Sequence, residues 1–72
     1  MVNVNRLKGK LVELGMNVET AANLIGMDKA TFYRRLASNG ETFTIGEADA
    51  ISKILNLTKS EVNDIFFAQY VA

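Results

Sequence analysis

The sequence predicts a small all-α domain built from five short helices. Apolar residues recur at helical spacing, as Leu7, Leu11 and Leu14 do, whereas the alternation typical of a half-buried strand is missing. Capping residues precede the apolar segments and glycines follow several of them, in a chain that has no proline to supply breaks. We expect residues 1–72 to form one domain whose helices are too short to be stable alone and therefore depend on packing.

The first helix is expected over about residues 5–14 and the second over about residues 18–25. Asn17 is placed to cap the second helix, because its side-chain oxygen can accept a hydrogen bond from a free amide of the first turn. Gly26 permits the positive φ that a tight reversal into the next helix requires. Gly9 weakens the interior of the first helix and suggests a close helix contact at that point.

The third helix is expected over about residues 29–37, with Asp28 as its N-terminal cap. Phe32 and Leu36 are four residues apart and should be buried on one face of this helix. Ala22, in the preceding helix, should lie where the two helices approach closely, so that a larger side chain there would push them apart. Residues 38–40, Ser-Asn-Gly, are typical of a turn.

Two capping boxes mark the remaining helices. Thr44-Ile45-Gly46-Glu47 opens a helix expected over residues 45–55, and Thr58-Lys59-Ser60-Glu61 opens the fifth. In such a box the threonine and glutamate side chains each accept a hydrogen bond from the other residue's backbone amide. This reciprocal pair is the most specific helix-start signal in the chain.

The C-terminal tail is rich in bulky apolar groups, among them Phe66, Phe67 and Tyr70. One small domain cannot easily bury them all, and an exposed apolar patch would mark a surface for a partner. Two interpretations therefore stay open: these side chains fold back onto the core, or they form a homodimer interface.

The composition excludes several kinds of function. The chain has no cysteine and no histidine, which removes disulfides, thiolate zinc sites, cysteine nucleophiles and the usual general base near neutral pH. No apolar stretch has the length of a signal peptide or of a membrane span. We therefore expect a cytoplasmic protein that is not an enzyme and that binds no cofactor, no metal and no membrane.

Charge is distributed unevenly along the chain, although the formal net charge is zero. Residues 1–36 carry six basic and three acidic groups, a net charge of +3, whereas residues 37–72 carry two basic and five acidic groups, a net charge of −3. One half of the molecule could therefore face phosphate while the other half faces away from it.

The order of these elements, together with several residues, resembles a known family. Gly15-Met16-Asn17, Ala21-Ala22, residues 24–32 (Leu-Ile-Gly-Met-Asp-Lys-Ala-Thr-Phe) and the later Asn39-Gly40 look like the Xre/Cro/CI class of phage and bacterial helix-turn-helix proteins. The resemblance covers about residues 5–66. It implies a compact five-helix lambda-repressor-like DNA-binding domain with the helix-turn-helix at the second and third helices. A chain of this length without a second domain looks like a phage Cro-like repressor or a lysogeny-switch regulator in a bacterial host cell.

The resemblance also implies which residues contact DNA, because members of this family read bases with the first turn and the outer face of the third helix. The base-contact candidates are Lys29, Ala30, Tyr33 and Arg34. The phosphate-contact candidates are Asn17, Thr31, Arg35, Asn39, Thr42 and Thr44. Arg34 can offer two parallel hydrogen bonds to guanine, and Lys29 can bind either guanine or phosphate.

Several functions stay open at this point. The leading hypothesis is a sequence-specific transcriptional regulator that inserts its third helix into the major groove of a double-stranded DNA operator. The alternative is a phage modulator of repression that acts by binding a partner CI-type repressor protein. The zero net charge suits this alternative, as does Val18, where many relatives carry a phosphate-binding glutamine. An antitoxin has similar chemistry, and an enzyme is the least favoured class.

Overall fold

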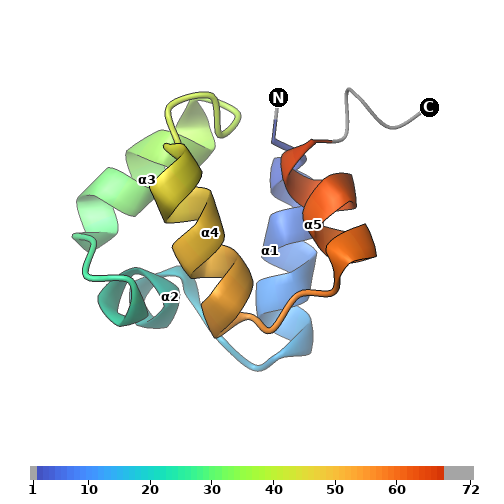
Figure 1. The fold of residues 1–72 in the computed structure, drawn as a ribbon. Helices are drawn as coiled ribbons and strands as arrows, with labels where there is room; N and C mark the ends of the chain where they lie inside the picture. The colour runs from blue at the N-terminus through green and yellow to red at the C-terminus, as the bar shows by residue number, and fades with distance from the viewer. Residues whose placement is uncertain (1, 68–72) are drawn as a thin grey trace.

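The computed structural model describes residues 2–67, and this part of the chain folds into five helices with no strand. In order, the helices are α1 (Val4–Glu13), α2 (Val18–Leu24), α3 (Lys29–Ala37), α4 (Ile45–Ile54) and α5 (Lys59–Phe66). The predicted all-α class is confirmed, and the first four helices end within one residue of their expected bounds. In Figure 1, α4 lies in the middle of the molecule, with α2 and α3 on one side and α1 and α5 on the other.

Hydrogen bonds between side chains and nearby amides determine where the helices begin. Both predicted capping boxes are formed: Thr44 and Glu47 exchange hydrogen bonds of 2.9 and 3.0 Å, and Thr58 and Glu61 exchange bonds of 2.9 and 3.1 Å. The side-chain oxygen of Asn3 accepts a hydrogen bond from the amide of Arg6 at 3.1 Å at the start of α1. These bonds satisfy amides that no helical carbonyl can reach.

One hydrophobic core joins all five helices. Its buried residues are Leu7, Leu11, Ala21, Ala22, Phe32, Leu36, Ile51, Leu55, Ile65 and Phe66. Leu14, expected on the buried stripe of α1, is 42% exposed because the helix ends at Glu13 and Leu14 is its C-terminal cap. The expected close contact at Gly9 is also wrong, since a β-carbon there would meet nothing within 4 Å. Within residues 2–67, no helix has both the length and the apolar character that crossing a lipid bilayer requires.

Contacts between distant parts of the chain close the domain. The amide of Asn3 donates a 2.6 Å hydrogen bond to the carbonyl oxygen of Ile65, so the start of α1 is tied to the end of α5. Farther along the same two helices, the Lys10 ammonium lies 2.6 Å from a carboxylate oxygen of Glu61. The hydrogen bond from Lys10 lowers the pKa of the Glu61 carboxyl to about 2, helped by the amide of Thr58. The same pairing raises the pKa of Lys10.

Candidate functional site

The segment from Asn17 to Ala37 folds as two capped helices joined by a tight turn. Asn17 accepts a 2.8 Å hydrogen bond from the amide of Thr20 at the start of α2, and Asp28 accepts one of 3.0 Å from the amide of Ala30 at the start of α3. Between the helices Gly26 has a φ of +72°, a conformation that side chains other than glycine rarely adopt. The expected caps and the expected turn are therefore both present.

The inner side of α3 is held by apolar side chains. Phe32 has no exposed surface and Leu36 is 6% exposed, as their four-residue spacing predicts. The ring of Phe32 packs edge-to-face on the ring of Phe43, with centroids 5.5 Å apart. Beneath α3 lies α2, whose Ala21 and Ala22 are fully buried and bring the two helices together. The position of α3 therefore depends on a packed layer of small and aromatic side chains.

The outer side of α3 is open to solvent. All four base-contact candidates of the sequence are exposed: Lys29, Ala30, Tyr33 and Arg34. Tyr33 has 54% of its surface exposed. One guanidinium nitrogen of Arg34 donates a 3.0 Å hydrogen bond to the hydroxyl of Thr31, one turn earlier. The structure thus brings these residues onto one exposed side of α3.

The phosphate-contact candidates are more scattered and mostly hold hydrogen bonds within the chain. Asn17 and Thr44 use their side-chain oxygens as helix caps, and the Thr42 hydroxyl lies 3.0 Å from that of Ser38. Asn39 is exposed in the turn after α3 with a φ of +59°. Asn39, Thr42 and Thr44 follow α3, whereas Asn17 precedes α2, so these residues flank the pair of helices at different points.

Ion pairs determine how much positive charge this surface presents. A guanidinium nitrogen of Arg35 lies 3.1 Å from a carboxylate oxygen of Glu47, with both side chains less than one-third exposed. The Lys29 ammonium lies 3.7 Å from Glu19, but both of these side chains are more than half exposed, so that the pair is weak. No carboxylate of residues 2–67 lies within 4.0 Å of the Arg34 guanidinium. Arg34 is therefore the cation of α3 that is most available to an external anion.

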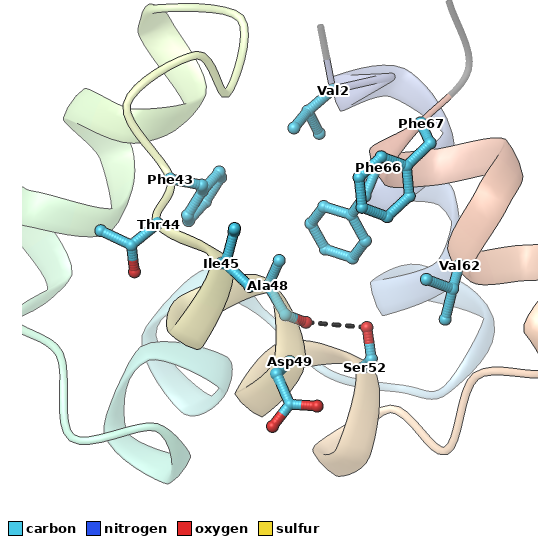
Figure 2. A pocket seen from close by; sticks show the side chains of 10 residues that line it. All are labelled: Val2, Phe43, Thr44, Ile45, Ala48, Asp49, Ser52, Val62, Phe66 and Phe67. Atoms are coloured by element: carbon cyan, nitrogen blue, oxygen red, sulfur yellow. Dashed lines mark hydrogen bonds between the residues drawn. The ribbon is translucent and has the colours of Figure 1, made fainter. Parts of the chain in front are cut away.

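Two features of the surface were not predicted from the sequence: the ion pair of Arg35 and an apolar groove away from α3. Glu47 was expected only as a cap, yet its second carboxylate oxygen also holds Arg35 from twelve residues away. The groove, shown in Figure 2, lies between the start of α4 and the end of α5. Neither feature has a local sequence signal, because each joins segments that only the fold brings together. The sequence indicates the groove only indirectly, through the apolar residues Phe43 and Ile45 on either side of the cap Thr44.

The three residues predicted to form a homodimer interface differ in how the structure places them. Phe66 is 6% exposed and belongs to the core, whereas Phe67 is 45% exposed at the end of α5. Tyr70 lies outside the described residues.

Among residues 2–67, no group of three or more acidic residues is arranged to hold a metal ion. No known family, curated protein or solved structure matches this chain.

Proposed function

We propose that this chain is a sequence-specific DNA-binding transcriptional regulator, with α2 and α3 as a helix-turn-helix. The observation that carries the proposal is the division of α3 into a buried and an exposed side. Phe32 and Leu36 hold the helix from beneath, while the base-contact candidates remain accessible. A helix with its side chains is about 10–12 Å across and fits the major groove, which is about 12 Å wide.

Arg34 is the residue expected to read sequence. Its hydrogen bond to Thr31 uses one guanidinium N–H, and the remaining donors can pair with the O6 and N7 atoms of guanine. Lys29 can leave its exposed pair with Glu19 and bind phosphate or guanine. The Ala30 methyl group can contact the methyl group of thymine, and the Tyr33 hydroxyl can bond to phosphate or to a base edge.

The regulator would act as a phage Cro-like repressor, occluding a promoter when α3 occupies an operator. A homodimer would present two copies of α3 to half-sites about one DNA turn apart. Of the six basic groups in residues 1–36, Lys29, Arg34 and Arg35 lie on α3, whereas Arg6, Lys8 and Lys10 lie on α1.

A fluorescence anisotropy titration with labelled DNA from the regulatory region beside the coding sequence tests the proposal. Phosphate contacts should make the affinity fall steeply between low and physiological salt. Arg34→Ala should reduce affinity for the preferred sequence by about 5- to 140-fold, the equivalent of the 1–3 kcal/mol that a bidentate base contact contributes. Affinity for unrelated DNA should fall far less.

Lys53→Ala is the matched control, because Lys53 is an exposed cation on α4, 75% exposed and paired with Asp49. It removes the same charge without touching α3, so its affinity should equal that of the native chain. An absence of binding at low salt would end the proposal. An equal loss for every DNA sequence would show instead that Arg34 contacts only the backbone.

A second candidate function, binding to a partner CI-type repressor protein, is favoured by one specific observation. Val18, where many members of the resembled family carry a phosphate-binding glutamine, packs against the core and offers no polar group at the start of α2. In that function the exposed cations of α3 would bind carboxylates of the partner. Co-purification with the neighbouring repressor, with and without DNA, separates the two candidates, since a modulator would bind the repressor in the absence of DNA.

A further inference from the structure

An open groove with a volume of about 330 Å³ lies between the first turn of α4 and the last turn of α5. Figure 2 shows Phe43, Ile45 and Ala48 on one side of the groove. Val62 and Phe66 of α5, and Phe67 directly after it, lie on the other side. Ile45 is 86% exposed and Phe67 is 45% exposed, so two large apolar side chains border the opening. No residue of α3 lines the groove, and of the DNA-contact candidates only Thr44 does.

The chemistry of the groove favours an apolar, uncharged occupant. Seven of its ten lining residues are apolar, and Asp49 is the only charged one. The polar groups are largely engaged already: the Ser52 hydroxyl donates a 2.7 Å hydrogen bond to the carbonyl of Ala48, and the Thr44 hydroxyl caps α4. Asp49 pairs with Lys53 at 2.9 Å. An occupant would therefore be recognised mainly by removing its apolar surface from water.

We propose that the groove is the docking site for this chain's own residues 68–72, with the ring of Tyr70 as the main contact. These residues, Ala-Gln-Tyr-Val-Ala, carry no charged side chain and directly follow Phe67, which is itself part of the groove wall. Tyr70 is three residues beyond Phe67, and three extended residues reach about 10 Å. An aromatic side chain brings about 150–250 Å² of surface to such a site and can leave its hydroxyl at the wet edge.

Tethering favours this occupant over a second copy of the chain. A segment joined to the wall of its own site has an effective concentration in the millimolar range, whereas a second copy must bind at its actual concentration. Docking of Tyr70 would also cover Ile45 and Phe67, the two exposed groups at the border. A chain whose tail fills its own groove cannot use the same walls for the dimer contact through Phe67 and Tyr70. The inference is thus independent of DNA binding but competes with that mode of dimerisation.

Tyrosine fluorescence gives a direct test, because the chain has two tyrosines and no tryptophan. In a Tyr33→Phe background Tyr70 is the only tyrosine, and the substitution removes only a hydroxyl from an exposed ring. Docking predicts that acrylamide quenches Tyr70 several-fold less in the folded protein than in denaturant. Ile45→Glu and Ala48→Glu should each raise quenching to the denatured value, because they place a charge in the apolar groove.

Val12→Glu is the matched control, since Val12 is 76% exposed on α1 and does not line the groove. It should leave quenching unchanged. Ile45→Glu keeps the test valid if Ala48→Glu unfolds the chain, because Ile45 is almost fully exposed, and circular dichroism checks the fold of each variant. Equal quenching in the folded and denatured states would overturn the proposal.

Isotope-filtered NMR on a mixture of labelled and unlabelled chains identifies whose tail occupies the groove. Nuclear Overhauser effects between the Tyr70 ring and the methyl groups of Ala48 and Val62 within one chain are expected. If these effects occur only between labelled and unlabelled chains, the groove binds a second copy and the intramolecular proposal is wrong.

Discussion

Enlarging Ala22 tests whether the contact between α2 and α3 is as close as the structure indicates. Ala22 has no exposed surface, and the amide of Met27 donates a 2.8 Å hydrogen bond to its carbonyl oxygen at the turn into α3. Ala22→Leu adds three carbon atoms at a site with no space, so either α3 moves outward or side chains leave their preferred rotamers. Leucine is nearly as good a helix former as alanine, so the effect reports packing and not helix propensity.

The expected magnitude follows from this burial. Overpacking a core position costs about 1–3 kcal/mol. A domain of this size has a free energy of unfolding of about 4–11 kcal/mol, so the variant should still fold at room temperature. At about 4–8 °C per kcal/mol, its Tm should fall by about 4–24 °C in a thermal melt followed by circular dichroism.

Ala30→Leu is the matched control, because Ala30 is an exposed alanine of the first turn of α3. Its Tm should stay within about 4 °C of the native value, since surface substitutions usually change stability by less than about 0.5 kcal/mol. If Ala22→Leu and Ala30→Leu melted at the same temperature, the contact between α2 and α3 would be looser than described.

Two further outcomes can be checked with the same thermal melts. The pKa of Glu61 is about 2 in the folded state, against an ordinary value of 4.5. The stability gained from its pair with Lys10 is therefore fully present above about pH 4.5 and is lost as the pH falls toward 2. The Tm of the native chain should therefore fall more steeply over this pH range than the Tm of Glu61→Gln. This variant keeps the capping-box acceptor but not the charge. If the two Tm values fell in parallel with pH, the ion pair would contribute nothing to stability. Gly40 has a φ of +74° and a β-carbon there would overlap the Val2 side chain, so Gly40→Ala should destabilise by at least about 1–2 kcal/mol. Gly9→Ala, in the open interior of α1, should instead stabilise by about 0.5–1 kcal/mol, and the same sign for both variants would contradict the structure.

Local signals predicted the helices well because their causes are local. The capping boxes at Thr44 and Thr58 each join residues three apart, and both form as expected. The error at Leu14 has the opposite origin. Its spacing continues the stripe of Leu7 and Leu11, but α1 ends before it, and the side chain remains exposed. Periodicity alone does not indicate at which residue a helix stops.

The exposed side of α3 was predictable in part. The spacing of Phe32 and Leu36 indicated the buried face, and Tyr33 and Arg34 were expected on the other. Which of these basic side chains forms an ion pair was not predictable, because ion pairs between helices depend on how the helices pack. Arg34 and Arg35 are adjacent in the sequence, yet the Arg35 guanidinium bonds to Glu47 whereas the Arg34 guanidinium bonds to Thr31.

The sequence by itself determined the number, order and approximate limits of the helices, together with the caps of α2 to α5 and the left-handed turn between α2 and α3. Each of these depends on groups within about four residues of one another, whose geometry the backbone fixes. Only the tertiary structure decided which cations are paired, how α1 and α5 are joined through Lys10 and Glu61, and where an apolar groove remains. Those features arise when segments far apart in the chain share one core, and no local pattern encodes that meeting.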